Sequence, residues 1–418
     1  MDKSKKNVPE IRFPGFTAPW EQRKLSDVAD IIGGGTPSTD VPEYWDGDID
    51  WYAPAEINDQ IYVDHSERKI TQLGLEKSSA KILTAHKTVL FTSRAGIGKT
   101  AILQHDAATN QGFQSLVLND DINPYFIFTM TEMIKSKAEK VASGSTFAEI
   151  SGKMLGKLEF MFPTFEEQAR IGDCFEHIDS IITLHQRKCD ELKIYKKGLL
   201  QQLFPQPGEA FPRVRFPGFT DPWEQRKLFA CIEKITDFRG RTPKKLGMDW
   251  SESGYLALSA LNVKDGYIDF NQDVHYGNQE LYDKWMSGNE LHKGQVLFTT
   301  EAPMGNVAQV PDNKRYILSQ RTIAFDVDEN VITESFLATV LRTPGVQSDL
   351  SSLSSGGTAK GVSQKTLNEV YIMIPNNTEE QESIASIFLG VDHLITLHQR
   401  KCDELKLYKK GLLQKMFV

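Results

Sequence analysis

The sequence has no long hydrophobic run and no excess of basic residues. No apolar stretch comes near the roughly 18 residues of a membrane span, and the polar segment from Met1 to Glu10 is unlike a signal peptide. We therefore expect a cytoplasmic protein. The formal net charge of −8 argues against a protein that wraps nucleic acid with its whole surface, so contacts with phosphates must come from local clusters of Lys and Arg.

Cysteine is scarce, and its spacing excludes a disulfide framework. No two of the cysteines form a CxxC pair, which predicts reduced thiols with a structural role. The four residues are Cys174, Cys189, Cys231 and Cys402.

Motifs of catalysis are missing as well. GIGKT, at Gly96 to Thr100, lacks the glycine that a phosphate-binding loop needs five residues before Gly98, where this chain has Ser93. NPYF, at Asn123 to Phe126, lacks the second proline of the amino-methyltransferase motif, and a turn that starts a helix explains it better. There is also no glycine-rich dinucleotide loop after a strand and no HExxH zinc motif. We therefore expect no catalytic residue, no metal and no cofactor on this chain.

What the chain does contain is one large internal repeat. RFPGFT at Arg12 to Thr17 recurs at Arg215 to Thr220, and the stretch from Ile182 to Gln201 recurs at Ile395 to Gln414 with a single difference. Between these anchors the two halves keep the same order of motifs while the residues within them differ: GGGTP aligns with RGRTP, and VLFTSRAGIG aligns with VLFTTEAPMG. Each half is thus a globular segment of roughly 160 residues followed by a helical one of about 40.

The two helical segments each show a heptad seam, with apolar or semi-apolar residues at alternating steps of four and three. The first seam is Ile171, Phe175, Ile178, Ile182, His185, Cys189 and Leu192. The second is Ile384, Phe388, Val391, Ile395, His398, Cys402 and Leu405. A seam this narrow needs a partner, and the simplest one is the other copy in the same chain. A two-fold relation between the copies predicts an antiparallel coiled coil that acts as a spacer.

Polar residues in this seam leave alternatives open. His185, Cys189, His398 and Cys402 are possible zinc ligands, but polar residues in a seam more often set its register, so we expect no metal there. A basic cluster close by forms either a solvated helix face or a contact to phosphate or a partner. It consists of Arg187, Lys188, Lys193, Lys196 and Lys197.

With GGGTPS, IDWYAP, VLFTSRAGIG, SGST and FPTFEEQ in this order, and an EEQ before each heptad helix, the chain resembles Type I restriction specificity subunits over essentially its whole length. The second half departs from these strings with RGRTPK, TEAPMG and YLALSA. The resemblance implies an α/β (α+β) fold with two tandem target recognition domains, each followed by a long helix. The implied bounds are 1–163 and 215–375 for the domains, 164–204 and 376–418 for the conserved helical regions, and 205–214 for a linker.

The same resemblance implies the partners. Each domain would read one half of a bipartite target in double-stranded DNA, and two methyltransferase subunits and the motor-nuclease subunits would join the helices. S-adenosylmethionine, ATP and Mg²⁺ would then belong to those partners. The repeat supports this division of roles between helices and domains. Nearly identical helices suit two copies of one partner, whereas divergent domains suit two different half-site sequences.

Candidate DNA contacts are side chains that present donors and acceptors to base edges from the divergent loops. In the first half they are Thr36, Ser38, Arg94, Asn110, Gln111, Ser145, Thr146 and Lys153. In the second half they are Arg239, Arg241, Lys244, Gln320, Arg321, Thr358, Lys360 and Lys365. For the Gly-Thr-Pro segments a plain turn is the alternative interpretation.

Two other functions compete with DNA reading. The acidic net charge favours a coiled-coil scaffold whose globular halves bind proteins. GIGKT, with Lys99, leaves open a nucleotidase, which the missing glycine argues against.

Overall fold

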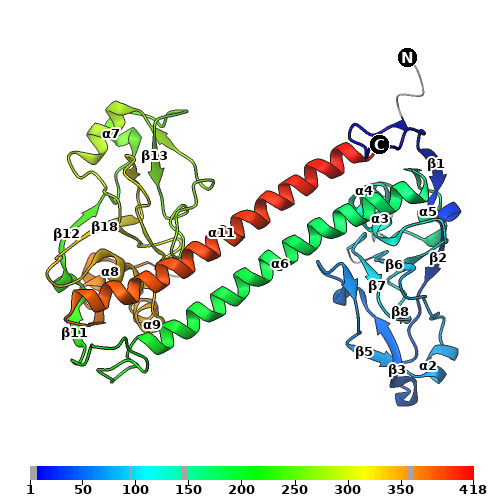
Figure 1. Ribbon diagram of the computed structural model, residues 1–418, viewed down its shortest axis with the longest axis horizontal. Coiled ribbons are helices and arrows are strands. Elements are labelled where there is room, and N and C mark those ends of the chain that lie inside the picture. Colours follow the sequence, from blue (N-terminus) through cyan, green and yellow to red (C-terminus); the bar gives the residue numbers. More distant parts are fainter. Residues whose placement is uncertain (1–6, 95, 143–148, 355–360) are drawn as a thin grey trace. The chain divides into compact units, whose positions relative to one another are not determined.

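The computed structural model describes residues 7–94, 96–142, 149–354 and 361–418, and it divides into two compact units (Figure 1). The first unit comprises Met1–Leu184 and Cys402–Val418, and the second comprises His185–Lys401. Each unit therefore contains one globular domain, the start of the long helix that follows this domain, and the end of the other long helix.

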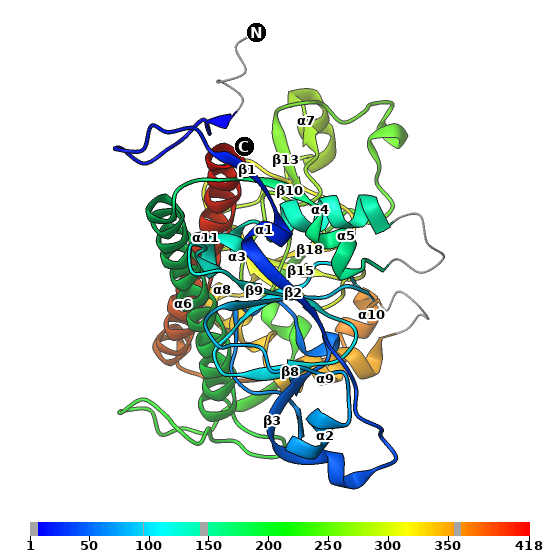
Figure 2. The same cartoon turned by 90° about the vertical axis from the view of Figure 1, so that its right-hand side faces the viewer.

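The first unit has a five-stranded sheet of order β2-β9-β6-β7-β4, a three-stranded sheet of order β5-β3-β8 and a two-stranded sheet of β1 and β10. Figure 2 views the molecule from the side of this unit, with β2, β3 and β9 among the labelled strands. Neighbouring strands run antiparallel, apart from the parallel pairs β4–β7 and β3–β8. The strands are β1 (Glu21–Lys24), β2 (Ala29–Gly33), β3 (Trp45–Tyr52), β4 (Tyr62–Val63), β5 (Arg68–Ile70), β6 (Thr88–Phe91), β7 (Thr100–Leu103), β8 (Ala107–Thr109), β9 (Gln114–Leu118) and β10 (Glu159–Phe162).

Short helices cover the sheets of the first unit. Asn123 caps α3, because its side-chain oxygen accepts from the Phe126 amide at 2.9 Å and Pro124 occupies the first helical position. NPYF is therefore a helix start, as predicted. The helices are α1 (Leu25–Val28), α2 (Gln72–Glu76), α3 (Pro124–Thr129), α4 (Thr131–Ala142) and α5 (Gly152–Gly156).

The second unit repeats this plan with a four-stranded sheet of order β12-β18-β15-β16, a three-stranded sheet of order β14-β13-β17 and the pair β11–β19. Its strands are β11 (Glu224–Lys227), β12 (Ile232–Asp237), β13 (Tyr255–Leu258), β14 (Tyr276–Gly277), β15 (Val296–Thr299), β16 (Val307–Gln309), β17 (Ile317–Leu318), β18 (Thr322–Val327) and β19 (Tyr371–Ile374). Its helices are α7 (Gln279–Met286), α8 (Glu334–Val340), α9 (Pro344–Leu353) and α10 (Gln364–Leu367).

The long helices are α6 (Phe165–Leu203) and α11 (Thr378–Met416), each of 39 residues. Contacts inside each unit join an early residue of one helix to a late residue of the other, as an antiparallel arrangement requires. In the first unit Lys409 binds Asp179 at 2.6 Å. In the second, Lys196 binds Asp392 at 2.9 Å, and near the middle of both helices the Nδ1 atoms of His185 and His398 are 2.7 Å apart.

Every predicted seam residue is buried or half-buried. The outer seam residues do more than pair the helices, because they also belong to the domain cores. Ile171, Phe175 and Ile178 pack with the first core, and Ile384 and Phe388 with the second. The Cys189 and Cys402 thiols lie 3.5 and 3.6 Å from backbone carbonyls, of Ile395 and Ile182 respectively. Within the described residues, no helix is both long and apolar enough to cross a membrane.

The N-terminal arm and the end of α11 meet in the first unit. The Ile11 amide donates to the Lys415 carbonyl at 2.9 Å, and Phe417 packs against Trp20 with ring centroids 5.9 Å apart. The linker makes the same contacts with the end of α6 in the second unit: Val214 donates to Gln202 at 3.0 Å, and Phe204 lies 5.6 Å from Trp223. These two contacts are here called the joints. In the second unit the chain itself runs from the end of α6 through residues 205–213 to the arm at Val214, whereas in the first unit the end of α11 and the arm at Ile11 are in contact without being consecutive in the chain.

We expect a circularly permuted chain to fold. In this variant Phe417 is joined to Ile11 by the sequence 205–213, and the chain is opened at Gly208. Because both joints already make the same contacts, the permuted chain should keep its free energy of unfolding within about 1 kcal/mol, since exposed loop tips tolerate such cuts. Denaturant unfolding monitored by circular dichroism measures this. A chain opened inside the fully buried strand β6 is the control that should fail to fold, and equal damage in both variants would contradict the equivalence of the joints.

Candidate nucleic-acid interface

Four loops of the first unit come together at one site, here called the first loop cluster: residues 33–38, 92–94, 109–113 and 149–153. Backbone bonds tie them to one another. The Gly35 amide donates to the Thr109 carbonyl at 2.8 Å, the Ser93 amide to Gly112 at 2.8 Å, and the Ile150 amide to Ser93 at 3.0 Å. Arg94 and Glu149 form an isolated antiparallel bridge.

All predicted contact residues of the first half that the structure describes lie in this cluster. Thr36 and Ser38 are exposed on the first loop, and the Thr36 hydroxyl donates to the Gln111 side chain. Arg94 and Asn110 are half-buried, and the Asn110 side chain accepts from the Gly112 amide at 2.7 Å. Lys153 is exposed on α5. Ser145 and Thr146 lie outside the described residues.

Gly34 makes the close approach of the loops possible. A Cβ at this position would lie 2.1 Å from the Asn110 carbonyl and 2.3 Å from that of Thr109, so neither backbone could stay in place. At Gly33 a Cβ would be 3.4 Å from the flexible Gln114 amide.

We therefore expect Gly34→Ala to separate the first two loops and to destabilise the first unit by about 1–3 kcal/mol. DNA recognition should be lost at the half-site of this domain, with the other half-site retained. Binding to duplexes in which one half-site at a time is scrambled measures both effects, with Gly33→Ala as the matched control. Equal behaviour of the two variants would show that the close contact does not matter.

The second unit builds the same framework, here called the second loop cluster: residues 237–244, 299–306, 319–321 and 361–365. Thr300 donates to the Arg321 carbonyl at 2.8 Å and Val362 donates to Thr300 at 2.9 Å, as Ser93 and Ile150 do in the first unit. Glu301 and Gly361 form the bridge that Arg94 and Glu149 form there. The backbone is thus repeated, whereas Glu301 occupies the position of Arg94.

Carboxylates and carbonyls hold the arginines of the second cluster. Arg239 binds Asp237 through Nε at 2.8 Å and through its terminal nitrogen at 2.6 Å, and Gln364 donates to the same carboxylate at 2.8 Å. Burial alone would raise the pKa of Asp237, but these hydrogen bonds outweigh it and lower the pKa. Arg321 binds Glu301 at 2.8 Å. Since a guanidinium has five donors, each arginine keeps donors for a base or phosphate while the carboxylate orients it.

The other predicted residues of the second half are spread over this cluster. Arg241 is half-buried, lies over the Phe238 ring at 4.3 Å and donates to the Trp285 carbonyl. The Gln320 side-chain amide donates a hydrogen bond to the Arg241 carbonyl. Lys244 and Lys365 are exposed. Thr358 and Lys360 lie outside the described residues.

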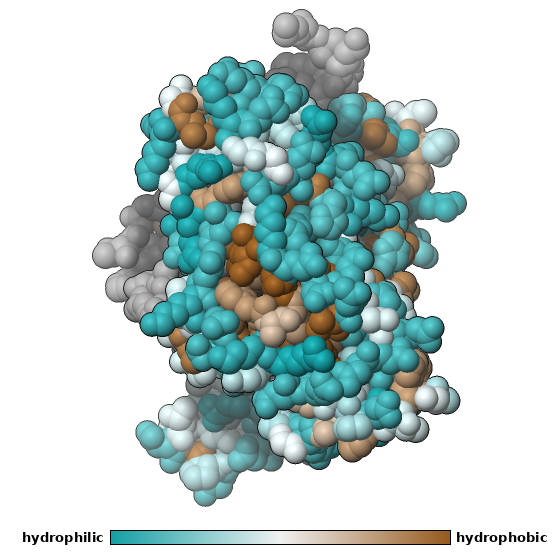
Figure 3. Space-filling model, turned by 90° about the vertical axis from the view of Figure 1, so that its left-hand side faces the viewer, coloured by the Kyte–Doolittle hydropathy of each residue, from teal (hydrophilic) through white to brown (hydrophobic). Residues whose placement is uncertain are grey.

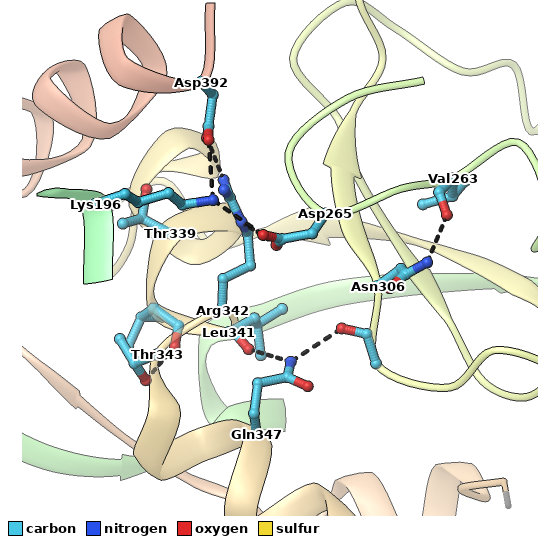
Figure 4. Close-up of polar contacts among 12 residues, drawn as sticks. Lys196, Val263, Asp265, Asn306, Thr339, Leu341, Arg342, Thr343, Gln347 and Asp392 are labelled. Atoms are coloured by element: carbon cyan, nitrogen blue, oxygen red, sulfur yellow. Dashed lines mark hydrogen bonds and ion pairs between the residues drawn. The ribbon is translucent and has the colours of Figure 1, made fainter. Parts of the chain in front are cut away.

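An ion network within the second unit ties both long helices to the domain (Figure 4). Lys196 of α6 binds Asp392 of α11 at 2.9 Å and Asp265 at 3.0 Å, and Arg342 binds Asp265 at 2.6 Å and Asp392 at 2.7 Å. Burial disfavours the charged form of Arg342, but the two aspartates outweigh it and raise its pKa. Lys196 is therefore a buried anchor, not part of a solvated basic face, in contrast to Arg187 and Lys188, which pair with Glu191.

Gln347 links the segment that follows Arg342 to one loop of the second loop cluster. The Gln347 amide of α9 donates to the Gly305 carbonyl at 2.9 Å and to the Leu341 carbonyl at 2.7 Å, and Asn306 donates to Val263 at 2.8 Å. Figure 4 shows Gln347 reaching from α9 toward this loop. The loop that carries Glu301 is thus fixed to the helix that follows Arg342.

Sequence reasoning missed the buried pairs that join each N-terminal arm to its long helix. Arg12 binds Glu167 at 2.6 and 2.7 Å, and Arg215 binds Glu380 at 2.7 and 2.8 Å. The signal was present, because the arginine of RFPGFT and the glutamate of EEQ both recur. Asp237 and Glu301 were missed too, and they show no such pattern.

Two copies of one loop framework with different side chains, each on a nearly identical helix, define a protein with two variable recognition surfaces on a constant scaffold. The family model of the Type I restriction modification DNA specificity domain matches the chain twice, at residues 18–193 and 221–407. The chain belongs to this family. It is a specificity subunit of the Type I class and not one of the catalytic subunits, as the resemblance predicted.

Individual relatives agree with this membership. The Type I restriction enzyme MjaIX specificity subunit of Methanocaldococcus jannaschii is 35% identical over 181 residues, 41% of this chain and 40% of the relative. The EcoR124I/EcoR124II specificity subunit of Escherichia coli is 27% identical over 38% of this chain and 41% of the relative. The matches thus span about 40% of the length of these two relatives.

A solved structure shows the fold. The crystal structure of the Type I restriction-modification S subunit from M. genitalium superposes with a TM-score of 0.67 over 98% of this chain and 99% of the other, at 14% sequence identity. The mixed helix and strand fold with two tandem domains and long helices is therefore confirmed.

Proposed function

We propose that this chain is the non-catalytic subunit that gives a Type I restriction-modification complex its DNA sequence specificity. Each domain reads one half of a bipartite target through its loop cluster. The repeated backbone of the two clusters is the observation that carries this proposal, because one framework with different side chains suits two related readings of different bases. The loops also present the Ser, Thr, Gln, Lys and Arg side chains that base edges pair with.

The proposal includes the helices as spacer and as docking site for two methyltransferase subunits. Large apolar side chains stay exposed at equivalent positions of both helices: Ile194 is 73% and Leu407 72% exposed, and Tyr195 and Tyr408 are 57% and 59% exposed. Exposed apolar groups of this size favour a protein partner. Since a large aliphatic residue followed by tyrosine recurs 213 residues apart, these positions suit two copies of one partner.

Catalysis belongs, in this proposal, to the methyltransferase and motor-nuclease subunits, with S-adenosylmethionine, ATP and Mg²⁺ bound there. The surface of the second unit is mostly hydrophilic on the face drawn in Figure 3, with one central hydrophobic patch.

A methylation survey tests the proposal. Cells that carry this chain and its methyltransferase partner should show methylation at one split sequence, two short words separated by a spacer of fixed length, which disappears when the chain is deleted. The purified chain with its partner should bind this duplex with an affinity that falls steeply with salt. Methylation without a split motif, together with salt-insensitive binding, would favour the scaffold alternative that the net charge of −8 suggests.

A further inference from the structure

Three potential metal ligands gather at one edge of the five-stranded sheet in the first unit. Asp64 and His65 directly follow β4, and His105 follows β7. These strands are parallel neighbours, with Val63 opposite Leu103 and the Gln104 amide donating to the Val63 carbonyl at 3.0 Å. Because parallel strands end at the same edge, the residues that follow them lie side by side.

The ligand atoms are close enough to share one ion. Nε2 of His105 is 2.6 Å from one Asp64 oxygen, and Nε2 of His65 is 4.0 Å from the other. The two imidazole rings are stacked, 5.2 Å apart and 3° from parallel. One atom from each of the three residues lies within 4.8 Å of the other two. Ligands of a tetrahedral zinc ion, at about 2.1 Å from the metal, are about 3.4 Å from each other, so small side-chain rotations suffice.

A buried carboxylate orients one of the histidines. Nδ1 of His65 is 3.4 Å from Asp50, whose side chain is 7% exposed. Asp50 in turn accepts from the Ser66 amide at 2.9 Å and from the Ser66 hydroxyl at 3.0 Å. A carboxylate behind Nδ1 favours the tautomer that leaves the Nε2 lone pair free, which is the usual arrangement of a metal-binding histidine.

We propose that Asp64, His65 and His105 bind one divalent transition-metal ion. Zn²⁺ is the ion with which the proposal is tested. Two imidazoles and one carboxylate are a ligand set for Zn²⁺ or Ni²⁺ rather than for Mg²⁺ or Ca²⁺. This proposal departs from the expectation, drawn from the sequence, of a chain without metal. The exposure of all three side chains leaves the fourth coordination position to water.

Through the contact of His65 with Asp50, the ion would be linked to the second of the two larger sheets of the first unit. Asp50 belongs to β3 of the three-stranded sheet, whereas the ligands extend from β4 and β7 of the five-stranded sheet. The β3 sheet also contains β8, which ends at Thr109 beside the first loop cluster. Metal binding should therefore make this domain more resistant to unfolding.

Zinc titration of the untagged full-length chain tests the proposal. Calorimetry should show one Zn²⁺ per chain, with an affinity at least tenfold lower in His65→Ala and in His105→Ala. His275→Ala is the matched control, since His275 is also exposed and lies 3.1 Å from a carboxylate, that of Asp273; it should bind like the unaltered chain. Zn²⁺ should also raise the melting temperature of the unaltered chain and of His275→Ala, but not that of the other two variants.

Co²⁺ gives an independent readout. The unaltered chain should show the intense visible absorption of low-symmetry, four-coordinate Co²⁺, and Asp64→Asn should weaken it. Circular dichroism checks that the variants fold, which their exposed positions favour. Absence of Zn²⁺ binding, or the same affinity in His65→Ala and His105→Ala as in the unaltered chain, overturns the proposal. Neither result bears on DNA reading, which the methylation survey tests.

Discussion

Replacing Glu380 by alanine should destabilise the second unit by about 3–5 kcal/mol, because the change leaves the Arg215 guanidinium buried without a counter-charge. Glu380 is 1% exposed and receives two hydrogen bonds from Arg215 and one from the Trp223 indole at 3.3 Å. The hydrogen bonds to Glu380 raise the pKa of Arg215 in the unaltered chain. Without Glu380, Arg215 still cannot lose its charge to relieve the cost, because a guanidinium stays protonated in proteins. Denaturant unfolding measures the free energy.

The repeat supplies the controls. Glu167→Ala should cost the first unit a similar amount, since Glu167 is equally buried and pairs with Arg12. Glu379→Ala removes an exposed carboxylate one residue away and should change stability by no more than about 0.5 kcal/mol. The double variant Arg215→Met, Glu380→Met should be less damaging than Glu380→Ala. If Glu380→Ala were as mild as Glu379→Ala, the pair would not hold the arm to the helix.

Arg94→Ala and Arg321→Ala should each weaken DNA binding at one half-site and leave the other intact. A lost bidentate contact to a base is worth about 1–3 kcal/mol, or roughly 5- to 150-fold in affinity. Arg321 is 56% exposed and its partner Glu301 43%, so their ion pair adds little to stability. The Arg321 variant should therefore unfold like the unaltered chain, which separates recognition from folding.

Glu301→Gln sharpens this test. It removes the carboxylate that orients Arg321 but keeps the arginine, so we expect a smaller loss, confined to the second half-site. Competition between duplexes with single base changes in either half-site measures which word each variant misreads. A loss at both half-sites from one substitution would contradict two independent loop clusters.

Much of the fold could be predicted because the repeat and the heptads are local patterns. The conserved helical region expected at 164–204 contains α6, Phe165–Leu203. The period marks the apolar face of a helix but not the group that covers it. Nothing in the spacing distinguishes Ile171, which packs in a domain core, from Ile395, whose carbonyl lies beside the Cys189 thiol of the other helix.

The site could be predicted only in part. Divergent loops between repeated anchors indicated the segments that gather in the two clusters. Which groups meet inside a cluster depends largely on the pairing of distant strands, so Glu301 beside Arg321 could not be foreseen. Asp237 lies only two residues before Arg239, but no periodic pattern indicates this pair. The same holds for His65 and His105, which only the parallel pairing of β4 and β7 brings together. Which loop residues touch bases remains a prediction.

The joint between the N-terminal arm and the end of α11 has a genetic consequence. Residues 182–201 and 395–414 are nearly identical, and a crossover between their coding stretches would leave a chain with one domain and one helix. Phe417 packs with Trp20 and Phe126 in the intact first unit, and the helix that leaves a domain cannot turn back to supply this side chain. A second copy would have to provide it. On the proposed function, the resulting homodimer would read one word twice in opposite orientations, so a single deletion would convert an asymmetric target into an interrupted palindrome.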